Sequence, residues 1–233
     1  MAEKINKNKV LATMVRGFFN GYSAGIIDSQ ITDAYEKRKP QVVKKVMLEH
    51  YEQISVAFHD VLFYPIAHVN YSEEEITRRV QENFKEGMTM IDLVKMACKT
   101  DEMHQAMIAE YKRNFEWLLQ GSMPSVENHD KEYIRGNEYM DIDKAIKLSV
   151  RVVMTAYAEG VKSSGKETAN FHQPSILRLV LDAMTVLLND VAPEDELADN
   201  SEGLARLFLK ACKKKEYFQL MTEAMDAEYE RIA

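Results

Sequence analysis

The stretch Gly87–Gly121, GMTMIDLVKMACKTDEMHQAMIAEYKRNFEWLLQG, decides the fold class of this chain. At about 100° per residue, its apolar side chains fall on one stripe and its charged side chains lie on the opposite face. The apolar stripe consists of Val94, Ala97, Ile108, Tyr111, Phe115 and Leu118. Thr89 stands where an N-cap is needed, with Asp92 three residues on in the capping-box position. The pattern predicts one long amphipathic helix.

Asp101 and His104 interrupt the middle of this apolar stripe. A carboxylate or an imidazole is costly at a buried position unless it is paired or hydrogen-bonded. His50 occupies the same kind of position on the apolar face predicted for residues 40–63. We therefore predict an internal ligand-binding pocket near His50, Asp101 and His104. The alternative, in which each is a core residue satisfied by its neighbours, stays open.

The composition of the whole chain extends the helical prediction beyond this stretch. Of the 233 residues, 46% are hydrophobic and 29% charged, which suits a globular protein with a proper core. Nine Gly and five Pro leave few turns, and helix formers are abundant. No heptad seam persists, so a coiled coil is not indicated. The sequence predicts an all-α fold, an irregular bundle of about eight helices.

Glycines, prolines and capping residues mark the expected ends of these helices. We expect helices over 7–22, between Asp28 and Pro40, over 40–63 and 73–86, in the quoted stretch, and after Asp141, Pro174 and Ser201. Gly21 and Gly25 are expected to end the first helix, and Pro65 to stop the third.

Residues 121–140 have no helical period and are predicted to be a linker or lid, which could contain a short hairpin around residues 135–137. This segment divides the chain into an N-terminal helical part, 1–120, and a C-terminal helical part, 141–233. We expect the two parts to pack together as one domain.

Charge is distributed unevenly along the chain. The net charge is −7, yet residues 1–50 contain nine basic and five acidic side chains. A basic end on an acidic body can indicate nucleic-acid binding, although a solvated surface is the more common explanation. No long apolar run or secretion signal is present, so we expect a cytoplasmic protein without a membrane span. Cys98 and Cys212 are then expected to be two buried thiols.

Motifs that carry chemistry are few. Asp101 and His104 have the i, i+3 spacing of one half of a di-iron site, but no second carboxylate-x-x-His exists. His50 and His104 could instead hold a haem or a metal ion between two helices, which is one alternative. Phosphate loops, nucleophile elbows and zinc patterns are missing, so catalysis is not favoured.

Residues 76–111 carry a resemblance to a known family. A helix followed by Gly87, an apolar residue, the cap Thr89 and a long helix with Leu93 and Val94 resembles the N-terminal sensor domains of RsbR-type stressosome regulators. This resemblance implies a globin-like fold without haem that dimerises and senses. The output domain that usually follows in that family is not part of this chain.

The first helix carries a second resemblance. Its end, FFNGY at residues 18–22, is similar to the first helix of TetR-type repressors, which bind DNA through an N-terminal helix-turn-helix. The segment between Gly21 and Pro40 leaves room for one helix where that motif needs two. The prediction is therefore a cytoplasmic sensory or regulatory module that binds a small ligand or a protein partner and forms a homodimer. A TetR-like repressor that contacts nucleic acid through residues 1–50 is the alternative.

Overall fold

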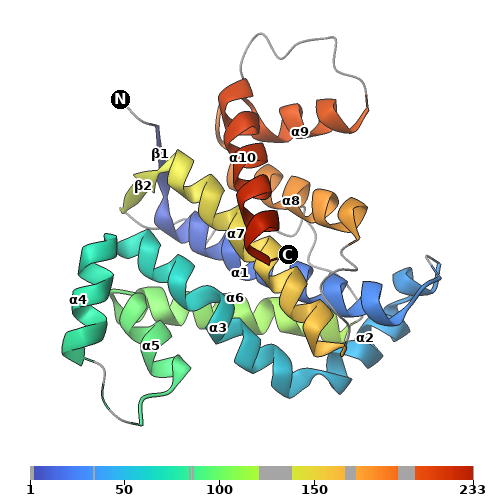
Figure 1. Ribbon diagram of the computed structural model, residues 1–233, viewed down its shortest axis with the longest axis horizontal. Helices are drawn as coiled ribbons and strands as arrows, with labels where there is room; N and C mark the ends of the chain where they lie inside the picture. The colour runs from blue at the N-terminus through green and yellow to red at the C-terminus, as the bar shows by residue number, and fades with distance from the viewer. Residues whose placement is uncertain are drawn as a thin grey trace.

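The computed structural model describes residues 3–33, 35–83, 85, 87–120, 138–165, 172–193 and 203–232. These residues form an all-α bundle with one small two-stranded sheet (Figure 1). The elements are β1 (Lys4–Asn6), α1 (Lys7–Gln30), η1 (Glu36–Arg38), α2 (Pro40–Glu49), α3 (Tyr51–Asn70), α4 (Glu73–Asn83), α5 (Met90–Ala97), α6 (Asp101–Leu119), β2 (Tyr139–Asp141), α7 (Ile142–Ser163), α8 (Gln173–Leu187), α9 (Leu204–Cys212) and α10 (Lys215–Ile232). The predicted all-α class is confirmed. Within the described ranges, no helix is both long and apolar enough to cross a bilayer.

Helices α1 and α7 form the centre of the bundle and run in the same direction (Figure 1). Strands β1 and β2 pair antiparallel just before them, with Ile5 opposite Met140, and so fix where both helices begin. Further along, the Tyr22 hydroxyl lies 2.7 Å from the Ser163 hydroxyl. The two sequence halves therefore share one core around this helix pair.

Glycines bring α1 and α7 close together. Gly21 lies against the backbone of α7 at Val153 and Tyr157, and Gly25 lies against Tyr157 and Val161. The prediction that Gly21 and Gly25 end the first helix is wrong, because here the absence of a side chain allows close packing and the helix continues to Gln30. No separate second helix begins at Asp28.

Helix α1 is buried on nearly every side, so its polar face lies inside the protein. Lys9, Thr13 and Arg16 are all buried. The Lys9 ammonium lies 2.6 Å from an Asp190 carboxylate oxygen, and Thr13 donates its hydroxyl to the Lys9 carbonyl at 2.9 Å. Burial lowers the pKa of Arg16, and the carboxylate of Asp182 acts in the opposite direction. The central helix thus depends on internal polar partners as well as on apolar packing.

Three further helix boundaries differ from the prediction. The quoted stretch is not one helix: α5 ends at Ala97 and α6 begins at Asp101, with Lys99 at φ +61° between them. The predicted capping box of Thr89 with Asp92 is confirmed. The expected helix over 40–63 is divided at His50, and α3 continues through Pro65, which is buried with its neighbours Ile66 and Ala67. Burial of this apolar segment offsets the one backbone hydrogen bond that Pro65 removes.

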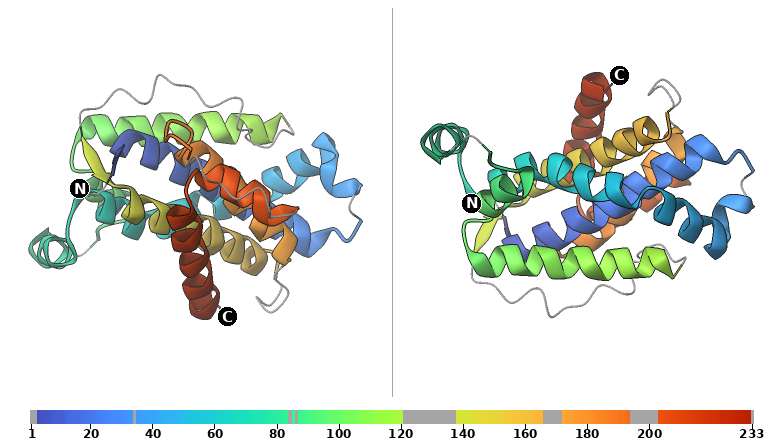
Figure 2. Two further views of the ribbon diagram at one scale, coloured as in Figure 1. Left: turned by 90° about the horizontal axis from the view of Figure 1, so that it is seen from above. Right: turned by 90° about the horizontal axis from the view of Figure 1, so that it is seen from below.

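Helices α8, α9 and α10 form a C-terminal layer over α7 (Figure 1). Helix α10 packs along α7 with Tyr217, Met221, Ala224 and Met225 buried, and its C-terminal end projects beyond the other helices (Figure 2). Residues 121–137, which include the predicted hairpin and most of the predicted lid, lie outside the described part of the chain. Strand β2 was not expected, because its partner β1 is far away in sequence.

Candidate functional site

The structure separates His50 from the other two predicted site residues. His50 lies at the junction of α2 and α3, where its Nδ1 donates to the Val46 carbonyl at 3.0 Å and its Nε2 lies 3.4 Å from the Gln30 amide nitrogen. Helices α3 and α6 pack side by side with the Tyr51 and Phe115 rings 5.3 Å apart. His50 is therefore next to the far end of α6, roughly 16 Å along the helix from His104 at 1.5 Å per residue. The expected shared pocket is not formed.

Asp101 and His104 do lie one turn apart, but in a different setting from the one predicted. Because α6 begins at Asp101, this carboxylate belongs to the first turn, where its side chain is 81% exposed and 3.7 Å from the Lys95 ammonium. His104 is half-buried, and its Nε2 has no hydrogen-bond partner among the described atoms. Burial lowers the pKa of His104. The prediction placed Asp101 on the apolar face by counting residues around one uninterrupted helix. Because the chain breaks between α5 and α6, that count does not hold, and Asp101 faces solvent.

The histidines and cysteines do not combine into a metal site in the described ranges. No group of three or more His, Cys, Asp or Glu residues is arranged there to hold a metal ion. Cys98 and Cys212 are both buried, and burial raises the pKa of each thiol to about 12. Thiols with such a pKa are inert at neutral pH.

Basic residues near the N-terminus are largely paired within the chain. Lys4 lies 2.6 Å from Asp141, Lys7 lies 2.8 Å from Glu138, and Lys9 is buried against Asp190. All three partners come from the acidic second half of the sequence. Since α1 is the buried centre of the bundle, it cannot act as the exposed first helix of a helix-turn-helix without unfolding the core.

An apolar hollow lies between α8, α9 and α10, and we call it the C-terminal groove. It measures about 370 Å³. Its lining residues are Gln173, Leu177, Leu204, Ala205, Phe208, Phe218, Met221, Thr222, Met225, Asp226 and Tyr229. A volume of this size, mostly apolar with a few polar groups, is typical of sites for small organic molecules.

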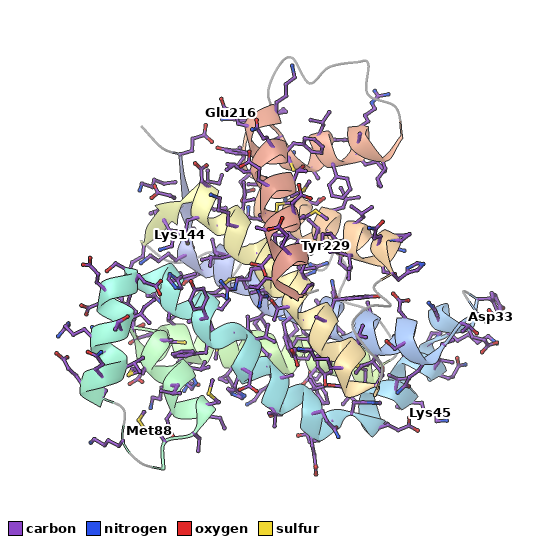
Figure 3. All side chains as sticks on the ribbon, viewed as in Figure 1. Asp33, Lys45, Met88, Lys144, Glu216 and Tyr229 are labelled. Carbon is purple, nitrogen blue, oxygen red and sulfur yellow. The ribbon has the colours of Figure 1, made fainter. Side chains whose placement is uncertain are left out.

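Helix α10 contributes two apolar faces, and this duplication creates the groove. One face packs on α7, as described above. The other, which includes the half-buried Phe218 and Tyr229, turns toward α8 and α9, and the buried Met225 lies between the two faces. Tyr229 lies near the end of α10 on the side of α8, and Glu216 stands at the start of the helix (Figure 3).

Helix α9 forms the outer wall of the groove. It packs principally against α8 and α10. Phe208 is buried, but Leu204 and Leu207 are 47% and 53% exposed. The outer wall of the groove is therefore buried at Phe208 and open to solvent at Leu204 and Leu207.

Polar groups are concentrated at one end of the groove. Asp226 and Tyr229 lie one turn apart on α10. Burial raises the pKa of Tyr229, with a further contribution from the Asp226 charge, so the phenol stays protonated at neutral pH. Thr222 donates its hydroxyl to the Phe218 carbonyl at 2.9 Å. The phenol and the carboxylate are therefore the groups that a ligand could contact at this end.

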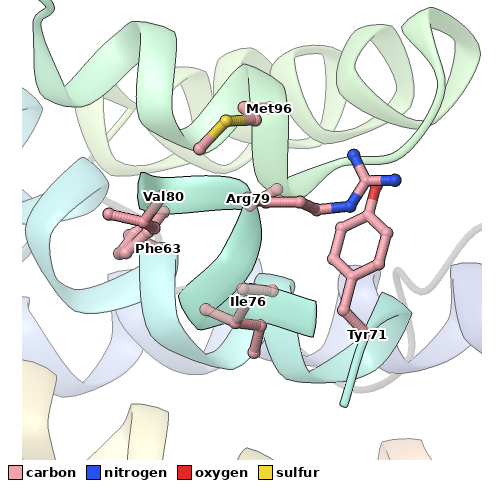
Figure 4. Close-up of a pocket in the computed structure, with 8 residues that line it drawn as sticks. Phe63, Tyr71, Ile76, Arg79, Val80 and Met96 are labelled. Carbon is pink, nitrogen blue, oxygen red and sulfur yellow. The ribbon is translucent and has the colours of Figure 1, made fainter. Parts of the chain in front are cut away.

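A second, smaller hollow lies beneath α4 (Figure 4). Phe63, Ile76, Val80 and Met96 surround a cavity of about 10 Å³, enough for one water molecule. The guanidinium of Arg79 covers the Tyr71 ring at 4.2 Å and separates this cavity from a shallow polar depression that includes Lys95 and Asp101. This cavity is too small for a ligand, and the neighbouring depression of about 450 Å³ is open and lined mostly by polar and charged side chains. We place the candidate site in the C-terminal groove because its walls are mostly apolar.

The sequence contained one signal for the groove that the helical period alone did not reveal. The apolar positions of residues 215–232 cover a wider arc than one packing partner needs, because Phe218 and Tyr229 lie outside the stripe of Met221 and Ala224. Which part of that arc faces α7 and which faces a hollow depends on where α8 and α9 lie.

Comparisons with known proteins leave the family of this chain open. No protein-family model matches the sequence, no curated protein is significantly similar to it, and no solved structure matches it significantly. The geometry of the site is therefore the basis of the function proposed below.

Proposed function

We propose that this chain is a sensory or regulatory module that binds a small apolar molecule in the C-terminal groove. The observation that carries the proposal is the groove itself, a hollow of about 370 Å³ with Leu177, Phe218 and Met225 among its walls. Burial of about 250 Å² of apolar surface by a ligand would contribute roughly 6 kcal/mol. This corresponds to a dissociation constant on the order of tens of micromolar before ordering costs are subtracted.

A regulatory role is supported by the position of α9. This helix is held mainly by α8 and α10, the same two helices that form the rest of the groove. A ligand between them adds contacts to Leu204 and Phe208, and so stabilises α9 in one position. The exposed Leu207 on the same helix would then present a ligand-dependent surface to a protein partner or to a second copy.

The proposal is tested by blocking the groove without touching the core. Ala205 lines the groove on exposed α9, so Ala205→Trp fills the hollow while leaving the α1–α7 core unchanged. Ala227→Trp is the matched control, because Ala227 is exposed on α10 and does not line the groove. The probe is N-phenyl-1-naphthylamine, a neutral apolar dye whose fluorescence rises when it leaves water.

We expect saturable binding of the dye to the unmodified protein and to Ala227→Trp, with at least about tenfold weaker binding to Ala205→Trp. Circular dichroism of all three proteins establishes that the helices are intact. Absence of saturable binding to the unmodified protein, or equal binding to Ala205→Trp, would refute the proposal.

A further inference from the structure

Asp226 is the one charged side chain among the described residues that line the C-terminal groove. Its carboxylate stands at the polar end, beside the Tyr229 phenol and within the same hollow as the Phe218 ring. A charged group in an otherwise apolar site usually determines which ligand the site accepts, because a ligand of the wrong sign loses hydration without gaining a partner.

No described cation neutralises Asp226. The contrast with its neighbour Glu228 is clear: Glu228 lies 2.6 Å from the Arg231 guanidinium and 4.0 Å from that of Arg151. On the preceding turn, Glu223 accepts a hydrogen bond from the Gln219 amide at 2.8 Å. In the part of the chain that the structure describes, Asp226 has neither a basic partner within 4 Å nor a hydrogen bond.

Aromatic rings line the same groove as this carboxylate. Tyr229 follows it by one turn, and the rings of Phe208 and Phe218 lie 6.5 Å apart at an angle of 59° on the walls of the groove. The faces of aromatic rings attract cations, and the attraction adds to that of a nearby carboxylate. Apolar walls, rings and one carboxylate together fit a ligand that combines an apolar body with a positive charge.

We propose that the C-terminal groove selects organic cations, such as hydrophobic ammonium or phosphonium compounds, with Asp226 as their counter-ion. This inference rests on the proposed function and specifies its ligand class. An anion of the same shape would be held by the apolar walls close to the solvent-exposed carboxylate of Asp226, and would bind more weakly because the two negative charges repel. We expect a difference on the order of tenfold or more between the two charges.

The experiment uses two ions of nearly equal shape and opposite charge, tetraphenylphosphonium and tetraphenylborate. Each displaces N-phenyl-1-naphthylamine from the full chain at low ionic strength, which gives its dissociation constant. The variants are Asp226→Asn, which removes the charge, and Asp226→Glu, which keeps it. Glu223→Gln is the matched control, because it removes one carboxylate from the same helix outside the groove.

In the unmodified protein, in Asp226→Glu and in Glu223→Gln, we expect tetraphenylphosphonium to bind at least about ten times more tightly than tetraphenylborate. In Asp226→Asn the ratio should fall to near one. If the neutral dye binds but the ions show no preference, or if the preference survives in Asp226→Asn, the cation inference is overturned and the proposed function stands. If the neutral dye does not bind the unmodified protein, both fail. If Ala205→Trp converts a dimer into a monomer in sedimentation, a second copy occupies the groove and the cation inference is overturned.

Discussion

Replacement of Gly21 by Ala tests the close packing of α1 on α7, on which the whole bundle depends. A Cβ at Gly21 would lie 2.5 Å from the Val153 carbonyl oxygen and 3.1 Å from the Ala156 Cβ. Contacts below 3.0 Å are essentially never seen, so the two helices would have to separate locally by about 0.5 Å. The obstacle is backbone in the middle of a helix, which cannot rotate away.

The expected free-energy change follows from two opposing effects. Alanine is the better helix former and gains about 1 kcal/mol. Overpacking typically costs about 1–3 kcal/mol, and the upper end applies when backbone must move. We therefore expect Gly21→Ala to lower the free energy of unfolding by about 2 kcal/mol.

Gly17→Ala is the matched comparison on the same helix. Its Cβ would lie 2.9 Å from a methyl group of Val153, a side-chain atom that can shift. We expect its stability to stay within about 1 kcal/mol of the unmodified protein, because the helix-propensity gain offsets the contact. Urea denaturation followed by far-ultraviolet circular dichroism measures both variants. A Gly21→Ala protein as stable as Gly17→Ala would refute the idea that close backbone contact holds α1 and α7 together.

Two further predictions concern buried polar groups. Burial holds the pKa of His104 below its usual value of 6.5, so the unfolded chain binds the proton more readily than the folded protein. The free energy of unfolding should therefore fall as the pH drops below about 6.5, and His104→Gln should flatten this fall between about pH 7 and pH 5.5 in urea titrations. An unchanged slope of the free energy of unfolding against pH would contradict the role of His104. Asp190→Asn leaves the Lys9 ammonium, whose side chain is only 4% exposed, without its carboxylate partner at 2.6 Å. We expect this substitution to lower the free energy of unfolding by about 1–2 kcal/mol, which is at the low end for buried pairs because the Asp190 side chain is 64% exposed. Lys9→Met removes the buried charge and should lower the free energy of unfolding by less than Asp190→Asn does in urea titrations. A larger decrease in Lys9→Met than in Asp190→Asn would count against this explanation.

Most of what the sequence predicted correctly depends on residues close together in the chain. The all-α class, the Thr89 capping box with Asp92, and the helix that begins near Pro174 follow from local propensity and capping. These features form through hydrogen bonds and side-chain contacts within a turn or two. Periodicity and caps are therefore sufficient to identify them.

The errors share a different cause, because they concern positions where a distant segment decides the outcome. Gly21 was expected to end a helix, and only the backbone of α7 explains why it is instead a packing residue. Pro65 was expected to stop α3, but burial against the bundle keeps the helix continuous. Asp101 was placed on a buried face, although the break at Lys99 turns it toward solvent.

By itself, then, the sequence determined that this protein is a helical bundle whose core residues come from the segments before and after residues 121–140. Only the tertiary structure decided that α1 lies at the centre with its polar side chains inside, and that His50 and His104 are apart. It also decided that α8, α9 and α10 enclose a hollow beside Asp226. The physical reason is that a helical period gives the direction of each side chain relative to its own axis, whereas a site requires the relative placement of several axes.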